Sequence, residues 1–235
     1  MEKFGKVYMV ATPIGNLKDI TLRALDTLNE VDLILAESIS YSKRLLNHYG
    51  IRKPLLRFNQ HNEKKRVSKV MKLLNEGKSV AYISNAGSPG ISDPGAYLVS
   101  KAYENGIQVV PIPGPSAITA ALSVCGIPSN SFIFLGFLPR RKGKRKRLLE
   151  SIRGEDRPVV LFESPNRILG LLPEIREILG KETQLVILRE MTKAFEEIRR
   201  GDVDRILEYL SKRDIRGEIT IVLRAEKFKA LIKKL

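Results

Sequence analysis

The stretch SVAYISNAGSPGISDPG, residues 79–95, decides the fold. Its first part, SVAYIS (79–84), is a short apolar run typical of a buried strand. Its second part, NAGSPGISDPG (85–95), is rich in glycine and proline, which end regular structure and let the backbone approach a ligand closely. The stretch therefore predicts a strand that runs into a ligand-binding turn, as at the carboxyl edge of an open α/β sheet.

The segments around this stretch alternate between strand and helix patterns. Apolar runs at 7–11, 31–36 and 107–112 predict further strands. Between two of them, apolar residues recur with helical spacing at Val67, Val70, Met71 and Leu74, and an earlier helix has Ile20, Ala24, Leu25 and Leu28 on one face. Strands that alternate with helices predict a mainly parallel sheet.

The run PIPGP (111–115) interrupts regular structure, and we place a domain boundary there, with domains 1–114 and 115–235. Ser116 is a suitable N-cap for a helix over 117–124. In the second half we expect strands at 132–138, 159–163, 185–189 and 218–224, and helices that begin at Ser164-Pro165 and at Asp202. The predicted fold is two α/β domains in series.

The charge balance indicates a polyanionic partner. Lysine and arginine total 41 against 26 acidic residues, so the formal net charge of the 235 residues is +15. Such an excess favours capture of nucleic acid, although a lysine- and glutamate-rich surface is also typical of heat-adapted proteins. One cysteine and two histidines argue against a disulfide or a zinc site. No long apolar run or signal peptide is apparent, so we expect a cytoplasmic protein.

Three turns rich in glycine or proline follow predicted strands, at 12–16, 85–95 and 113–116. One such turn simply ends a strand, but three in one domain predict a pocket at the carboxyl edge of the sheet. The sequence has no GxGxxG after its first strand and no GxxxxGK[ST], which argues against a Rossmann dinucleotide site and a P-loop. The residues alone therefore predict a polar small-molecule pocket.

Several motifs occur in the same order as in the tetrapyrrole-methylase superfamily. They are TPIGNL (12–17), VDLI (31–34) with Ala36-Glu37, HNE (61–63), AGSPGISDPG (86–95), PGPSA (113–117), GFLP (136–139), FESP (162–165), LREMTK (188–193) and Gly217-Glu218. A collinear set of motifs is more specific than any one of them. The chain resembles this superfamily, and within it the 2′-O-ribose methyltransferases of small-subunit ribosomal RNA.

The resemblance implies S-adenosylmethionine as the cofactor, held in a cleft between the two domains, and a homodimer. It also implies that the partner is the small ribosomal subunit and that the target is the ribose of cytidine 1402 in 16S ribosomal RNA. The residues that would bind the cofactor are Pro13, Asn85, Ala86, Gly87, Ser88, Ile91, Ser116, Ala117, Phe162, Arg189 and Glu218.

The chain departs from the family pattern at three places. AESIS (36–40) stands where the family has Ala-Glu-Asp-Thr-Arg, so an acid and a base are absent beside the expected substrate side. Asn85 replaces an aspartate, and Asn166 replaces a histidine. These departures bear on the RNA target and on activity rather than on the fold.

Seven cationic side chains lie within residues 139–147, with no apolar residue before Leu148, so we expect a mobile, exposed loop. We interpret this segment as an arm that binds RNA phosphates, the alternative being an ordinary solvated surface run. The predicted RNA-binding residues are Arg140, Arg141, Lys142, Lys144, Arg145, Lys146 and Arg147.

Methyl transfer to a ribose hydroxyl needs a base to remove the proton, and it needs no metal because the sulfonium is already a good leaving group. Our base candidates are Glu37, His61 and Glu63, although a surface or helix-capping role fits each of them equally well. For Glu163 and Arg189, the alternative to a role in the site is a structural one, in which an inter-strand ion pair fixes them.

Two other functions stay open at this stage. One is C-methylation of a tetrapyrrole in the cobalamin or sirohaem route. The other is a non-catalytic RNA-binding factor for ribosome assembly, suggested by the changed residues 38–40. Failure to bind S-adenosylmethionine would favour the assembly factor over both enzymes.

Overall fold

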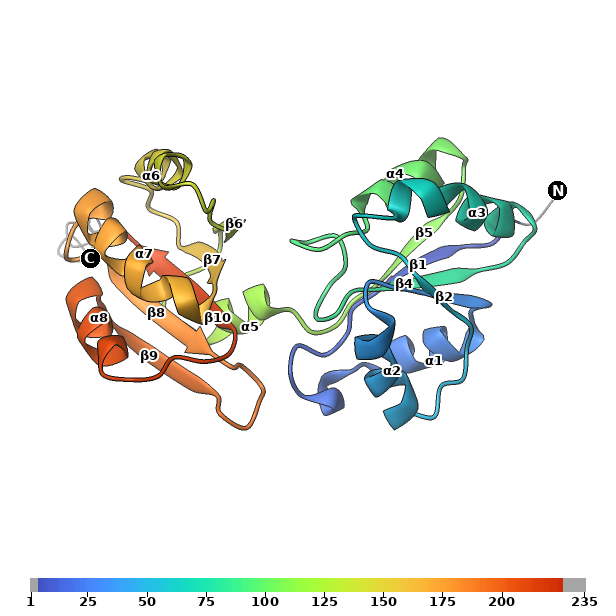
Figure 1. The fold of residues 1–235 in the computed structure, drawn as a ribbon, viewed down its shortest axis with the longest axis horizontal. Coiled ribbons are helices and arrows are strands. Elements are labelled where there is room, and N and C mark those ends of the chain that lie inside the picture. The colour runs from blue at the N-terminus through green and yellow to red at the C-terminus, as the bar shows by residue number, and fades with distance from the viewer. Residues whose placement is uncertain (1–3, 226–235) are drawn as a thin grey trace. The chain divides into compact units, whose positions relative to one another are not determined.

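The computed structural model describes residues 4–225. These residues form two compact units, divided between Ser116 and Ala117, and the division expected after Gly114 lies two residues earlier. Each unit contains one five-stranded sheet with helices packed on it (Figure 1). The predicted α/β class is confirmed. No helix of the described residues is long and apolar enough to cross a membrane.

The first unit has a fully parallel sheet in the order β3-β2-β4-β1-β5, as the alternating pattern predicted. Its elements are β1 (Val7–Val10), the short 3-10 helix η1 (Leu17–Asp19), α1 (Leu22–Glu30), β2 (Leu33–Ala36), α2 (Ile39–His48), β3 (Leu55–Arg57), α3 (Glu63–Asn75), β4 (Val80–Ile83), α4 (Ala96–Glu104) and β5 (Val109–Ile112).

Helices cover both faces of this sheet, because alternate residues of each strand point to opposite sides. On β4, Val80 and Tyr82 belong to the cluster packed under α3 and α4, whereas Ala81 and Ile83 belong to the cluster packed under α1 and α2. Figure 1 shows these two helix pairs on opposite sides of the sheet. Because helices bury both faces of the sheet, the accessible part of its strands is the carboxyl edge, where the turns lie.

The second unit has a mixed sheet in the order β6-β7-β10-β8-β9. The pair β6 and β7 is parallel and the other pairs are antiparallel. Its elements are α5 (Ala117–Val124), β6 (Ile133–Phe137), α6 (Lys142–Ser151), β7 (Val159–Glu163), α7 (Pro165–Leu179), β8 (Gln184–Arg189), β9 (Glu197–Asp202), α8 (Val203–Ser211) and β10 (Ile219–Arg224).

The second sheet also has two covered faces. Helices α6, α7 and α8 pack on one face through a cluster that includes Leu161, Ile187 and Ile221. Helix α5 packs on the other face, where Cys125 is buried beside Val186 and Val222. This placement confirms Cys125 as a buried core residue.

The helices predicted from apolar spacing are present, although Ile20, which we expected on the face of the first one, precedes α1. The buried residues of α3 are the four that the spacing selected, Val67, Val70, Met71 and Leu74. Asp202 caps α8 by accepting a hydrogen bond from the amide of Arg205 at 2.9 Å. Ser164 precedes Pro165, which is the first residue of α7 as predicted.

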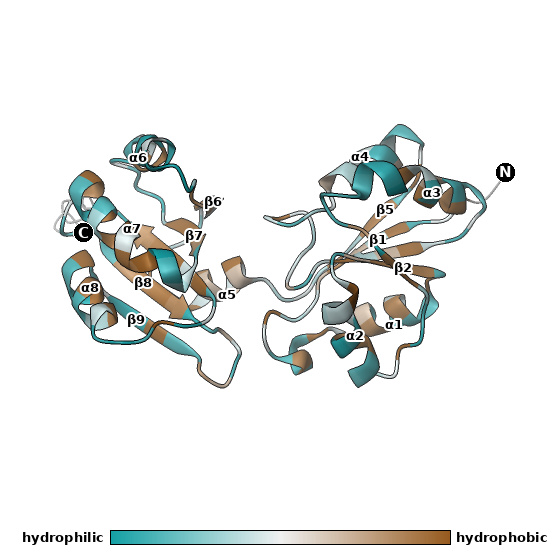
Figure 2. Ribbon diagram, in the orientation of Figure 1, coloured by the Kyte–Doolittle hydropathy of each residue, from teal (hydrophilic) through white to brown (hydrophobic). Residues whose placement is uncertain are grey.

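The expected mobile loop at 139–147 is wrong. Residues 142–151 form helix α6, which is strongly hydrophilic over most of its length (Figure 2). The prediction failed because the segment shows no apolar face before Leu148. The helix is anchored instead by Leu149, which is fully buried, and by the half-buried side chain of Arg145.

Candidate active site

The three turns that the sequence singled out meet at the carboxyl edge of the first sheet. Thr12 and Gly87 exchange two backbone hydrogen bonds, each of 2.9 Å, so the first two turns are tied together. Gly87 has φ 71°, and a Cβ there would lie 3.7 Å from the carbonyl oxygen of Pro115 in the third turn. Glycine permits the left-handed backbone, and the 3.7 Å separation is an ordinary van der Waals contact with the third turn. The turns therefore form one connected structure.

A small polar pocket lies beside these turns. It has a volume of about 60 Å³ and is lined by Thr12, Pro13, Gly15, Leu17, Tyr41, Ser42, Arg44, Leu45, Ile83, Ser84 and Asn85. The hydroxyl of Tyr49 at the end of α2 donates to the carbonyl oxygen of Leu17 at 2.7 Å, which holds α2 against the first turn. The pocket is thus bounded by rigid elements.

Two buried polar atoms of this pocket have no hydrogen-bond partner among the described residues. They are the Oγ of Ser42 and the Oδ1 of Asn85. A buried polar atom without a partner is destabilising, and in native proteins it commonly marks a ligand or water site. The pocket is therefore suited to a ligand that offers hydrogen-bond donors and acceptors.

Three carboxylates act electrostatically on one buried hydroxyl, that of Tyr82 on β4. We call Glu37, Glu63, Asp93 and Tyr82 the acidic group. Burial, and then repulsion from Glu37, Asp93 and Glu63, raise the pKa of the Tyr82 hydroxyl above its ordinary value. Tyr82 is 0% exposed and its hydroxyl has no hydrogen-bond partner among the described residues. The hydroxyl thus stays protonated at neutral pH.

Asp93 is a carboxyl of this site whose pKa is raised toward neutrality. Burial and, to a smaller degree, the charge of Glu37 raise the pKa of Asp93 to about 6, and a hydrogen bond from Ser84 only partly offsets them. Groups with pKa values moved toward neutral pH cluster at catalytic sites. Asp93 lies in the stretch 79–95 with which the sequence analysis begins, but we did not select it as a candidate site residue. The effect of Glu37 on it depends on the fold, because the two residues are 56 positions apart in the sequence.

The predicted bases lie in different surroundings. Glu37 directly follows β2, and its Oε2 accepts the backbone amide of Asn85 at 3.1 Å. Glu63 is the first residue of α3, and its Oε2 is buried without a partner among the described residues. His61 is exposed. Glu37 and Glu63 thus both act electrostatically on Tyr82, whereas His61 is not among the groups that raise the pKa of Tyr82 or Asp93.

The predicted cofactor residues of the first unit do not share one pocket. Pro13 and Asn85 line the small polar pocket, and Gly87 is buried in the joined turns. Ile91 is 47% exposed and lines a separate apolar groove of about 600 Å³, together with Val99 and Tyr103 of α4. Ala86 and Ser88 are half-buried beside Gly87, and Ser116 is the last residue of the third turn. Ala117 is the first residue of the second unit and begins α5. Cofactor binding by these residues stays a prediction.

The predicted residues of the second unit lie toward one end of its sheet. Ile219 at the start of β10 pairs with Arg189 at the end of β8, and the next residue, Thr220, pairs with Phe162 near the end of β7. Glu218 immediately precedes Ile219. Phe162 packs against Phe134 and Phe137 at ring-centroid distances of 5.1 and 5.6 Å. An aromatic surface and polar groups therefore lie close together in this unit.

The ion pair expected between Glu163 and Arg189 is wrong. The Glu163 carboxylate contacts Arg167 at 3.3 Å, and Arg189 contacts Glu197 of the neighbouring strand at 3.1 Å. Each partner is local: Arg167 is four residues along the chain from Glu163, and Glu197 is opposite Arg189 in the ladder. Arg189 thus has a partner on the neighbouring strand, whereas the Oε2 of Glu163 is buried without a hydrogen-bond partner among the described residues.

A tight turn follows Arg189. Glu190 and Thr192 have φ values of 51° and 66°, which non-glycine residues rarely adopt. The Glu190 carboxylate accepts from the amide of Glu218 at 2.9 Å and from the Lys193 ammonium at 2.8 Å. Backbone strain of this kind persists where the surroundings fix it, often at functional sites.

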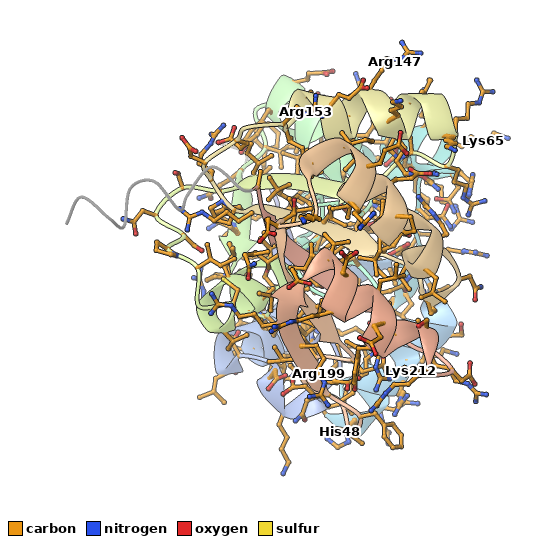
Figure 3. The ribbon with its side chains drawn as sticks, turned by 90° about the vertical axis from the view of Figure 1, so that its left-hand side faces the viewer. His48, Lys65, Arg147, Arg153, Arg199 and Lys212 are labelled. Carbon is orange, nitrogen blue, oxygen red and sulfur yellow. The ribbon has the colours of Figure 1, made fainter. Side chains whose placement is uncertain are left out.

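The basic segment combines one structural arginine with a set of exposed cations. Arg145 makes two hydrogen bonds to the Glu174 carboxylate, of 2.6 and 2.7 Å, and it also donates to the carbonyl oxygens of Pro139 and Arg140. The prediction that Arg145 is exposed to RNA is therefore wrong. The other six cations are exposed: Arg140, Arg141, Lys142, Lys144, Lys146 and Arg147. Figure 3 shows Arg147 projecting outward from α6.

Within residues 4–225, no group of three or more His, Cys, Asp and Glu side chains is arranged to hold a metal ion. The acidic group therefore lacks the geometry of a metal site. Its carboxylates are suited instead to accepting hydrogen bonds or protons.

Comparison with known proteins identifies a family and close relatives. Residues 6–207 match the model of the Tetrapyrrole (Corrin/Porphyrin) Methylases. The Ribosomal RNA small subunit methyltransferase I of Thermotoga maritima is 53% identical over 219 residues, which cover 93% of this chain and 98% of the relative. The protein of the same name from Haemophilus influenzae is 45% identical, over 94% of this chain and 79% of the relative.

Solved structures show the same two-unit fold at low sequence identity. A cobalt precorrin-4 methyltransferase superposes with a TM-score of 0.70 at 18% identity, covering 93% of this chain and 94% of that one. A uroporphyrin-III-C-methyltransferase from Thermus thermophilus gives a TM-score of 0.66 at 21% identity, with 98% of each chain covered. At these identities the similarity concerns the fold alone.

Proposed function

Because the chain belongs to the tetrapyrrole methylase family, we propose that it transfers the methyl group of S-adenosylmethionine to a ribose 2′-hydroxyl of small-subunit ribosomal RNA. The protein is an S-adenosylmethionine-dependent methyltransferase. What we propose is the acceptor of the methyl group, the ribose 2′-hydroxyl. The observation that carries it is the 53% identity, over nearly the whole of both chains, to a Ribosomal RNA small subunit methyltransferase I.

The distribution of charge supports an RNA acceptor. The net charge is +15, and six cationic side chains of residues 140–147 are exposed on and just before α6. Lysine and arginine that contact phosphates supply affinity through release of counterions, and they supply little sequence information. The exposed cations of α6 would therefore hold the RNA backbone, and the target nucleotide would be selected elsewhere.

The residues of the first unit fit S-adenosylmethionine. When bound, this molecule supplies a methyl group on a positively charged sulfur, together with amino, carboxylate and ribose groups that need hydrogen-bond partners. The joined turns allow close backbone approach at Gly87, and the Oδ1 of Asn85 is a buried acceptor without a described partner. Pro13, Asn85 and Gly87 are the residues of this unit that we expect to hold it.

The finer parts of the proposal concern the target nucleotide, the partner and the oligomeric state. We propose cytidine 1402 of 16S ribosomal RNA as the target, the assembled small subunit as a partner, and a homodimer as the active form. A ribosomal substrate would place the protein in the cytoplasm.

The decisive experiment uses methyl-labelled S-adenosylmethionine and small ribosomal subunits from cells that lack the corresponding modification. We expect label in 16S ribosomal RNA at one nucleotide, and the linkage after it should resist alkaline cleavage because the 2′-hydroxyl is blocked. Label on a base, or labelled tetrapyrrole with no labelled RNA, would refute the proposal. Calorimetry that shows no S-adenosylmethionine binding would instead support a non-catalytic assembly factor.

A further inference from the structure

Three arginines share the carboxylate of Glu197, which lies on the edge strand β9. This side chain is 16% exposed, and it contacts Arg189 at 3.1 Å, Arg199 at 3.1 Å and Arg213 at 3.8 Å. The hydroxyl of Tyr209 on α8 also donates to it. One carboxylate neutralises one guanidinium group, so an excess of two positive charges remains. We call Glu197, Arg189, Arg199, Tyr209 and Arg213 the arginine cluster.

The acidic residues on and next to α8 do not balance this excess, because each of them pairs with a cation outside the cluster. These pairs are Asp202 with Arg205, Asp204 with Arg176, Glu208 with Lys212, and Asp214 with Arg216. Among the ion pairs of residues 4–225, Glu197 is the one carboxylate that contacts three cations. Like charges held close together repel, and an anion that entered the arginine cluster would relieve this repulsion.

Tyr209 holds two of these arginines in place. The guanidinium carbon of Arg213 lies 4.2 Å from the centre of the Tyr209 ring, and that of Arg199 lies 4.6 Å from it. Both distances are in the range of a cation–π contact, and arginine stacks readily on aromatic faces. Tyr209 is half-buried and packs against the core of the second unit. The two guanidinium groups are thus positioned before a ligand arrives, which lowers the entropy cost of binding.

Arg199 and Arg213 have hydrogen-bond donors that a ligand can reach. Their side chains are 50% and 53% exposed. A guanidinium group carries five N–H donors. Glu197 takes the Nε–H of Arg199 at 3.1 Å, and one terminal nitrogen of Arg213 lies 3.8 Å from it. Glu197 thus engages a minority of these donors, and the exposed remainder can bind an anion.

We propose that Arg199 and Arg213, stacked on Tyr209, form a second phosphate-binding site for the RNA substrate. This inference rests on the function proposed above, from which the RNA is taken as the ligand. Guanidinium groups bind phosphate oxygens through paired N–H donors, and their planes also stack on unstacked RNA bases. Contacts with phosphates fix the position of an RNA and carry little sequence information. The site therefore contributes affinity and register.

The arginine cluster and the exposed cations of α6 lie at opposite ends of one layer of helices. Helices α6, α7 and α8 pack on the same face of the second sheet, whose edge strands are β6 and β9. Figure 3 shows Arg147 of α6 and Arg199 of β9 at opposite ends of this unit. Four strand spacings of about 4.8 Å separate the two edges by roughly 19 Å. One RNA segment that crosses α7 can contact both groups.

The test measures binding of a 16S ribosomal RNA transcript to the full chain over a series of salt concentrations. Arg199→Gln and Arg213→Gln should each weaken binding and reduce the salt slope by about 0.7–0.9, the value for one lost phosphate contact. The matched control is Arg205→Gln, which removes the same charge from α8. The Arg205 side chain is 82% exposed and pairs with Asp202, so this variant should keep the wild-type slope.

Two variants of Tyr209 test the stacking without a change of charge. Tyr209→Phe keeps the ring and should bind RNA as wild type does. Tyr209→Leu removes the ring and should weaken RNA binding by about two- to fivefold for each arginine that it releases. Circular dichroism establishes that both variants are folded. Equal RNA affinity of the two variants would contradict the role of the stacking.

The outcomes separate the two proposals, because one concerns methyl transfer and the other RNA binding. If wild-type protein transfers no label to a ribose, the proposed function is wrong, and the salt series still decides the role of the arginine cluster. If Arg199→Gln and Arg213→Gln keep the wild-type slope, or Arg205→Gln lowers it equally, the cluster is not a phosphate site while the function stands. A lower melting temperature with an unchanged slope would show a purely structural cluster.

A membrane surface is the other source of phosphate groups. Sedimentation with phosphatidylglycerol vesicles tests it on the same variants. If Arg199→Gln and Arg213→Gln lose binding to the vesicles and keep RNA binding, the ligand is a membrane and the proposal is overturned. We expect the reverse, a loss of RNA binding that exceeds any change with vesicles.

Discussion

Arg145 pairs with Glu174, so within residues 140–147 we expect Arg145 to contribute to stability and its exposed neighbours to contribute to RNA binding. Both side chains are only 14% exposed, and the guanidinium makes two bonds to the carboxylate and two to backbone oxygens. Removal of one partner of a buried pair costs about 3–5 kcal/mol, and the remaining exposure lowers this. For Arg145→Ala we expect a loss of about 2–3 kcal/mol in the free energy of unfolding.

Such a loss should lower the melting temperature by roughly 4–12 °C for a chain of this size, measured by calorimetry or circular dichroism. The matched variants are Lys144→Ala and Arg147→Ala, which flank Arg145 on α6, are exposed, and should change stability by less than about 0.5 kcal/mol. The double variant Arg145→Met with Glu174→Met should recover much of the stability, because it leaves no buried charge without a partner.

RNA binding should show the opposite pattern. Lys144→Ala and Arg147→Ala should each reduce the dependence of RNA affinity on salt concentration, by a slope of about 0.7–0.9 if each contacts one phosphate. Arg145→Ala should leave the slope of the folded protein unchanged. The reasoning is refuted if Arg145→Ala melts like wild type, or if it lowers the salt slope as much as its exposed neighbours do.

Three further predictions concern single positions. Tyr82→Phe should raise the free energy of unfolding by about 1 kcal/mol in urea denaturation, because it removes a buried hydroxyl without a described partner; a loss of stability would contradict this environment. The pKa of Asp93 in the folded protein is raised to about 6, so ionisation of Asp93 opposes folding. The stability of Asp93→Asn relative to wild type should therefore increase by at most about 3 kcal/mol between about pH 4 and about pH 6, and stay constant above. Melting curves across that range test the sign. Gly217→Ala should lose about 2 kcal/mol or more in the same assay, since φ is 88° and the added Cβ would lie 2.3 Å from the Glu190 Cδ; a stability equal to wild type would mean that Glu190 moves freely.

The elements with a periodic apolar face were predictable from the sequence. The spacing of Val67 to Leu74 predicted α3 and its buried side, and strand 159–163 was predicted with its correct bounds. Strand β9 was missed because EIRRGD (197–202) lies at the edge of its sheet, where exposed charged residues replace the apolar pattern. Helix α6 was mistaken for a loop because Arg145 is fixed by Glu174, 29 positions away.

Only those parts of the candidate site that lie within a local sequence motif were predictable from the sequence. Glycine- and proline-rich composition predicted the turn around Gly87, and the structure shows how it joins Thr12. The raised pKa of Asp93 was not predictable, since a single aspartate in a turn shows nothing about the burial and neighbouring charge that cause it. Those causes are created by the fold, which brings Glu37 and Tyr82 to the same edge of the sheet.

The central position of β1 has a consequence for the order of folding. This strand comes first in the chain, yet it pairs with both β4 and β5, which end at Ile83 and Ile112. During synthesis the sheet of the first unit therefore stays incomplete until nearly half of the chain has emerged. Parallel pairing between segments so distant in sequence is slow, because much chain entropy is lost before the contacts form. The edge that carries the joined turns is thus among the last parts of this unit to take shape, and a nascent chain that stalls before β5 exposes an unpaired side of β1.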